Sequence, residues 1–180
     1  PSDLGFLDAG YNLPALTVRD LIVGESGPTG GYLFAGMGLG GLGGRSRARR
    51  ESLTLRVDAA IALVARAPGP WIIWCGLNDE QDAIAEALGA DCVSIAGQDS
   101  ESQKQERIMA FIEGRVRVLV SKVRVAGFGL NLQHCAQMVF VGLGDSYEAY
   151  YQAIRRCYRF GQAHPVDVYV VVSESETEIV

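Results

Sequence analysis

Apolar residues along this chain fall into short continuous runs, and the stretches between the runs place their apolar residues at a helical period. Continuous runs of this length are typical of parallel strands that are buried on both faces of a sheet. The runs lie at residues 71–75, 92–95, 116–120, 138–141 and 166–172, and residues 16–23 could form a further strand.

The intervening stretches predict helices. Residues 45–67 place apolar side chains at i, i+4, i+8 and i+11, namely Leu53, Val57, Ile61 and Val64. Asn78 is expected to be the N-cap of a second helix that ends at Gly89, and Asp99 or Ser100 to open a third helix that ends at Gly114. Strands that alternate with helices predict an α/β fold of three layers, with a mostly parallel central sheet and helices on both faces.

Residues 1–44 do not follow this rhythm, and residues 27–44 are rich in glycine. A glycine-rich stretch before a helix can bind phosphate, but the P-loop pattern ends in G-K-[S/T] and the first lysine of the chain is Lys104. We therefore expect residues 1–44 to be a connecting segment and residues 45–180 to be the folded domain. The opening residues are neither a signal peptide nor a natural start, which predicts a fragment of a longer protein.

The composition narrows the class of protein to which this chain can belong. The chain has 180 residues, of which 48% are hydrophobic and 21% charged, as in one soluble globular domain. No apolar run reaches the roughly 18 residues of a membrane span. The net charge of −5 argues against a wholly basic nucleic-acid-binding domain, but it allows a local basic groove. The cysteines lack C-x-x-C spacing, so we expect no metal site and free thiols in a reducing cytoplasm.

Residues 150–162 contain three arginines within five positions, between two glutamines. On a helix, Gln152, Arg156 and Arg159 would share one face, Arg155 would point elsewhere, and Gly161 would end the helix. Guanidinium groups along one face suit a phosphate-rich ligand, because each planar fork can bond two oxygens. A solvated basic helix end explains the same pattern without a ligand.

This segment, read as Q-A-x-x-R-x-x-R-x-G-Q, resembles motif six of the Swi/Snf-type ATPases of helicase superfamily two. Upstream, residues 126–132 read A-G-F-G-L-N-L and resemble motif five of that family, although Ala126 stands where the family has glycine. The two motifs occur in the family's order, and the resemblance extends over residues 71–180. The sequence of residues 145–157 is most similar to the compact members of this family that are carried by phages and prophages.

The resemblance implies the second RecA-like lobe of an ATP-dependent DNA translocase or helicase. Such motors hydrolyse ATP between two lobes, and the first lobe holds the P-loop and the magnesium ligand. ATP and Mg²⁺ would thus be held mainly by an N-terminal lobe of the full-length protein, and this chain alone should be inactive. The expected partners are that lobe and DNA, most naturally duplex, in the cytoplasm of a bacterial or phage-infected cell.

Carried over residue by residue, the resemblance makes Arg159 the arginine finger and Arg156 its partner at the γ-phosphate. The other residues that it places near ATP are Gln152, Gly127, Gly129, Asn131 and Gln162. Helix-end capping is the plain alternative for the two glutamines. Asn131 could hold its own loop by bonding the backbone, or it could reach the nucleotide.

Four residues at strand ends are candidate contacts to the DNA backbone: Ser121, Lys122, Arg124 and Gln98. Ligands of open α/β sheets collect at the carboxyl ends of the strands, although charges at a strand end can also be plain surface. The acids of Asp79-Glu80-Gln81-Asp82 mimic a magnesium-binding box but suit the first turn of a helix. A noncatalytic nucleic-acid-binding module of the same fold is the alternative to a motor lobe.

Overall fold

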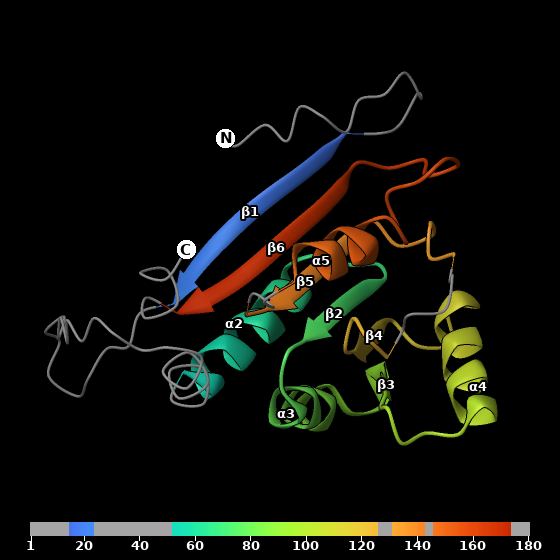
Figure 1. Ribbon diagram of the computed structural model, residues 1–180, viewed down its shortest axis with the longest axis horizontal. Coiled ribbons are helices and arrows are strands. Elements are labelled where there is room, and N and C mark those ends of the chain that lie inside the picture. Colours follow the sequence, from blue (N-terminus) through green and yellow to red (C-terminus); the bar gives the residue numbers. More distant parts are fainter. Residues whose placement is uncertain (1–14, 24–51, 126–130, 143–145, 174–180) are drawn as a thin grey trace, which may run out of the picture.

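The computed structural model describes residues 15–23, 52–125, 131–142 and 146–173, which form an α/β domain (Figure 1). These residues contain a six-stranded sheet in the order β1-β6-β5-β2-β4-β3, and every neighbouring pair is parallel. The strands are β1 (Leu16–Val23), β2 (Trp71–Cys75), β3 (Cys92–Ile95), β4 (Val118–Ser121), β5 (Gln137–Val141) and β6 (Val166–Ser173). The predicted fold class is confirmed.

The strand at one edge of the sheet comes from the segment that we expected to be a connector. β1 pairs with β6 along its whole length, from Leu16 opposite Val166 to Val23 opposite Ser173, and Figure 1 shows the two strands side by side. Residues 16–23 therefore belong to the domain. The glycine-rich stretch and the arginines of residues 45–50 lie outside the described residues.

Helices cover both faces of the sheet. They are α2 (Leu53–Arg66), α3 (Asn78–Leu88), α4 (Glu101–Ile112) and α5 (Tyr147–Ile154), with a short 3₁₀ helix at Gly89–Asp91. Buried residues of α2 and α3 join one hydrophobic cluster, and those of α4 and α5 join a second cluster on the other face.

β2 shows why the strands are continuously apolar. Trp71, Ile73 and Cys75 belong to the cluster under α2 and α3, whereas Ile72 and Trp74 belong to the opposite cluster. All five side chains are buried. Because each face of the strand is covered by helices, polar residues have no exposed position there. Each large apolar side chain buried in this way contributes about 1.5–3 kcal/mol to folding.

Glu80 organises the loop between β2 and α3. One carboxylate oxygen of Glu80 accepts the backbone N–H groups of Gly76 and Leu77, both at 2.9 Å, and so caps the helix. The other oxygen accepts a bond of 2.5 Å from Arg56 on α2, and both side chains of this ion pair are buried. The acids thus start a helix, as expected, although the N-cap is Leu77 and not Asn78.

The end of α3 and the start of α4 follow their sequence signals. Gly89 ends α3 with a φ of +55°, a conformation that favours glycine. Ser100 and Gln103 form a capping box at the start of α4.

The cysteines are free thiols, three of them buried. Across the described ranges, no helix is both long enough and apolar enough to span a bilayer.

Candidate functional site

The helix that carries the arginine-rich segment ends earlier than the sequence predicts. α5 ends at Ile154 with Arg155 as its C-cap, well before Gly161. Beyond this point the backbone hydrogen bonds are irregular: the N–H of Arg156 donates to the carbonyl of Ala153 at 3.2 Å, whereas the N–H of Arg159 donates to the carbonyl of Cys157 at 3.1 Å. This irregular winding turns successive side chains in different directions from those of an α-helix.

The prediction that Gln152, Arg156 and Arg159 share one helical face is therefore wrong. Gln152 is exposed, Arg156 is buried with 8% of its surface accessible, and Arg159 is half-buried. Arg155, which we expected to point elsewhere, lines the same cavity as Arg159. The structure thus separates the two motif arginines, and it is Arg155, which precedes both of them, that lines the cavity with Arg159.

The cavity beside Arg159 is open, has a volume of about 450 Å³ and is formed by two separate segments. Asn131 lies near the end of motif five and Gln133 directly follows that motif, whereas Arg155, Arg159 and Phe160 come from the turns after α5. Guanidinium groups and side-chain amides offer many N–H donors, and the described lining residues include no carboxylate. The cavity is therefore suited to an anionic ligand.

The two segments are joined by backbone and side-chain hydrogen bonds. The N–H of Leu132 donates to the carbonyl of Arg156 at 3.0 Å. Oδ1 of Asn131 accepts the backbone N–H of Gln133 at 3.3 Å, which holds the start of this segment in a local turn. Asn131 thus bonds its own loop, as one of the two alternatives expected, and it also lines the cavity, while its contact with a nucleotide stays a prediction.

Gln162 is a buried connection between the same segments. Its Nε2 donates to the carbonyls of Cys135 and Cys157, at 3.0 and 3.4 Å, and its Oε1 accepts the N–H of His164 at 3.0 Å. The side chain is therefore engaged by the backbone and lies outside the set that lines the cavity. This position agrees with the capping alternative better than with direct nucleotide contact.

Arg156 differs from Arg155 and Arg159 because it is a buried cation. Its Nε has no hydrogen-bond partner among the described residues, and burial lowers the pKa of its guanidinium from the ordinary value. The neighbouring Cys157 thiol has a pKa well above its usual range, because a side-chain hydrogen bond with Cys135 and burial both disfavour the thiolate. Both features place Arg156 and Cys157 in the body of the domain.

Sequence reasoning missed three of the residues that line the cavity: Gln133, Arg155 and Phe160. Phe160 is 81% exposed, an uncommon exposure for a phenylalanine that directly follows a candidate functional arginine. Phe160 could have been singled out from the sequence only if the turn that exposes it had been predicted. No sequence signal identifies Gln133, since its position depends on how the two segments fold together.

The candidate nucleic-acid residues gather at the carboxyl ends of β3 and β4, which pair so that Ile95 lies opposite Ser121. Gln98 and Arg124 are exposed there, and Lys122 is half-buried. Ser121 is fully buried and its hydroxyl donates to the carbonyl of Ile95 at 2.9 Å. Its observed contact is therefore within the protein.

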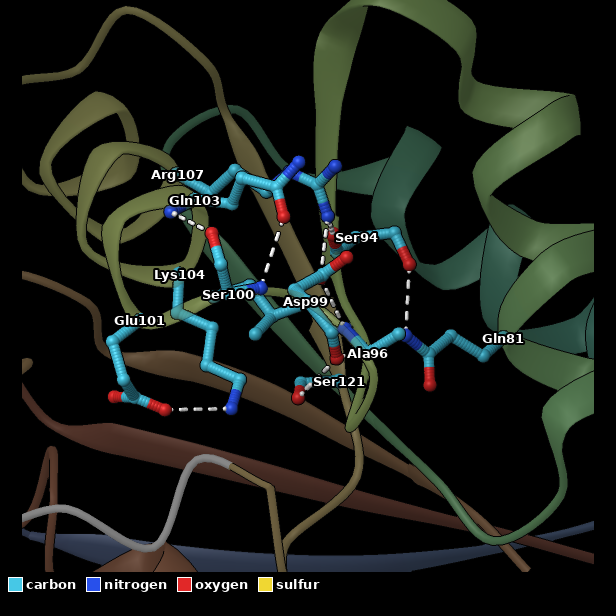
Figure 2. Close-up of polar contacts among 11 residues, drawn as sticks. Gln81, Ser94, Ala96, Asp99, Ser100, Glu101, Gln103, Lys104, Arg107 and Ser121 are labelled. Atoms are coloured by element: carbon cyan, nitrogen blue, oxygen red, sulfur yellow. Dashed lines mark hydrogen bonds and ion pairs between the residues drawn. The ribbon is translucent and has the colours of Figure 1, made fainter.

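The turn that carries Gln98 is held firmly at its base (Figure 2). One oxygen of Asp99 accepts the N–H of Ala96 at 2.7 Å and a bond of 2.5 Å from Arg107, whose same nitrogen donates to the carbonyl of Ser94. Ser94 lies on β3 and Arg107 on α4, so these bonds connect the strand, the turn and the helix. A turn fixed in this way presents its exposed residues in one orientation.

Two of the predicted nucleotide contacts, Gly127 and Gly129, lie outside the described residues. Asp145, the first residue of the stretch 145–157 that resembles phage proteins, also lies outside the described residues. Their assignments stay predictions.

Residues 56–161 match the family model described as the helicase conserved C-terminal domain. The chain is 28% identical over 109 residues to the bifunctional helicase and thymine dioxygenase JBP2 of Leishmania braziliensis, and equally to that of Leishmania infantum. Each alignment covers 60% of this chain and 10% of the relative. The chain therefore spans about a tenth of the length of these curated relatives.

Solved structures share the fold at low sequence identity. The C-terminal domain of the DEAD-box protein Dbp5 has a TM-score of 0.59 and 20% identity, over 70% of this chain and 74% of that one. The E. coli DEAD-box protein SrmB gives 0.57 and 20%, covering 67% and 72%. The C-terminal part of the Fun30 ATPase domain gives 0.55 and 18%, covering 76% and 43%. The domain thus has the RecA-like fold of helicase C-terminal lobes.

Proposed function

The chain belongs to the helicase conserved C-terminal domain family, and on that basis we propose that it is the second motor lobe of an ATP-dependent DNA translocase or helicase of the Swi/Snf type. In this proposal it supplies motifs five and six to an ATP site that an N-terminal RecA-like lobe completes. The observation that carries the proposal is the shared cavity, which Asn131 from the first motif and Arg159 from the second line together.

The chemistry of Arg159 fits such a site. Phosphoryl transfer spreads negative charge over the γ-phosphate oxygens, and a fixed guanidinium stabilises that charge as it develops. Arg159 is half-buried at the cavity, so its charge is less screened than that of a free surface arginine. The amide groups of Asn131 and Gln133 can donate further hydrogen bonds to phosphate oxygens.

The residues at the cavity do not suit a magnesium ion. Mg²⁺ prefers oxygen ligands, above all carboxylates and phosphates, and the cavity is lined by two arginines, two amides and a phenylalanine. Mg²⁺ would therefore be held by the N-terminal lobe and by the nucleotide itself. This division agrees with a site in which each lobe supplies one half.

DNA would meet the carboxyl ends of β3 and β4, where Gln98, Lys122 and Arg124 lie. Contacts of this kind reach the phosphate backbone and carry no sequence information. A motor that moves along duplex in the cytoplasm of a bacterial or phage-infected cell needs this type of contact, because it must release and rebind without regard to sequence. Ser121 would act indirectly, through its bond to Ile95.

The experiment compares ATP hydrolysis by this chain with hydrolysis by the full-length protein that contains an N-terminal lobe. We expect no turnover above background from the chain alone, with or without DNA, and DNA-stimulated turnover from the full-length protein. Turnover by the isolated chain that an Arg159→Ala substitution abolishes would contradict the half-site. A full-length protein that binds duplex but never hydrolyses ATP would support the noncatalytic nucleic-acid-binding module instead.

A further inference from the structure

Two adjacent arginines after α5 have opposite environments. Arg155 is exposed and lines the cavity with Arg159. Arg156 is 8% exposed, and it does not line the cavity. Its backbone carbonyl accepts the N–H of Leu132 at 3.0 Å, which fixes this residue against the end of motif five. Arg155 has no comparable tie among the described residues.

Among the described residues that line the cavity, Arg155 and Arg159 carry charge, whereas Asn131, Gln133 and Phe160 do not. Each guanidinium offers a planar fork of N–H donors that matches two oxygens of a phosphate group. Two such forks beside one open cavity suit a ligand that carries several linked phosphates. A volume of about 450 Å³ is sufficient for a polyphosphate chain.

We propose that Arg155 is the second phosphate-binding arginine of this cavity, so that Arg155 and Arg159 together hold the polyphosphate chain of the nucleotide. This inference rests on the proposed function, because it assumes that the cavity receives nucleotide phosphates. It departs from the motif, which requires arginines at positions 156 and 159 and none at 155. Arg156 becomes a positioning residue that anchors the turn in the domain.

The test is an NMR titration of the isolated chain with inorganic tripolyphosphate, following the Nε–Hε signals of its arginines. We expect the signals of Arg155 and Arg159 to shift along one binding curve. The substitution Arg155→Gln should weaken binding roughly tenfold, as should Arg159→Gln, because each removes a charge-assisted contact. Arg66→Gln is the matched control, since Arg66 is an exposed arginine on α2, over the opposite face of the sheet.

The outcomes separate the inference from the function on which it rests. If the Arg159 signal shifts while the Arg155 signal stays, or if Arg155→Gln binds like the wild type, Arg155 is not a phosphate ligand and the proposed function stands. A shift of Arg156 in place of Arg155 would restore the motif pair. If none of the three signals moves at the highest tripolyphosphate concentration reached, the inference fails, and the comparison of ATP hydrolysis by the full-length protein and the isolated chain decides separately on the proposed ATP site. A thermal melt of each variant verifies folding.

Discussion

The side-chain Nε2 of Gln162 donates a hydrogen bond of 3.0 Å to the backbone carbonyl of Cys135. The same nitrogen reaches the carbonyl of Cys157, and the amide oxygen accepts the N–H of His164. One buried amide therefore connects the end of the arginine turn to the segment that precedes β5. Because both segments line the cavity, Gln162 fixes the geometry of the site without belonging to its wall.

We predict that Gln162→Ala destabilises the domain by about 2–4 kcal/mol, because buried carbonyl and N–H groups lose their partner. For a domain of this size the melting temperature should fall by about 4–16 °C. The measurement is a thermal melt, with Gln98→Ala as control because Gln98 is exposed. Equal melting temperatures for the two variants would contradict a structural role for Gln162.

We predict that Arg159→Ala in the full-length protein lowers kcat by about 10³ to 10⁵, the range known for arginine fingers. Arg159→Lys should not restore the rate, because an ammonium group lacks the planar fork. Steady-state ATP hydrolysis at saturating DNA measures both variants, and Arg66→Ala serves as the control on the opposite face of the sheet. If Arg159→Ala and Arg66→Ala hydrolyse ATP equally fast, Arg159 is not a finger.

DNA binding by the isolated chain should be weak and independent of sequence, with a Kd of about 10⁻⁴ to 10⁻⁶ M at moderate salt. We predict that Lys122→Ala and Arg124→Ala each reduce the slope of log K against log salt by about 0.9, since each removes one phosphate contact. Fluorescence anisotropy with labelled duplex at several salt concentrations measures the slope. Unchanged slopes in both variants would locate the DNA contacts elsewhere, for example in residues 45–50.

Glu80→Ala should be among the most damaging substitutions in the domain. It removes a buried carboxylate that bonds Arg56 and two backbone N–H groups. Loss of one member of a buried ion pair costs about 3–5 kcal/mol. Urea unfolding measures the change, with Glu86→Ala as control because Glu86 is exposed on the same helix. A loss no larger than that of the control would show that the pair adds nothing to stability.

The sequence by itself determined the layered fold and the order of its elements. Continuous apolar runs such as Trp71–Cys75 are stable only when both faces are covered, so they predict a parallel sheet between helices. Local signals also fixed several helix ends, as Ser100 and Gly89 illustrate. The two motifs, recognised by their spacing, directed attention to the segments that the structure brings together at the cavity.

Only the tertiary structure decided which side chains reach that cavity. The arginine-rich segment has a helical pattern, but its backbone leaves the helix at Ile154. Beyond that residue Leu132 bonds the carbonyl of Arg156 from another segment, Gln162 bonds the carbonyl of Cys157, and Cys157 packs into the core. Arg155 consequently lines the cavity and Arg156 is buried. Likewise, the place of residues 16–23 at the sheet edge depends on pairing with β6, a contact between distant segments that no local pattern encodes.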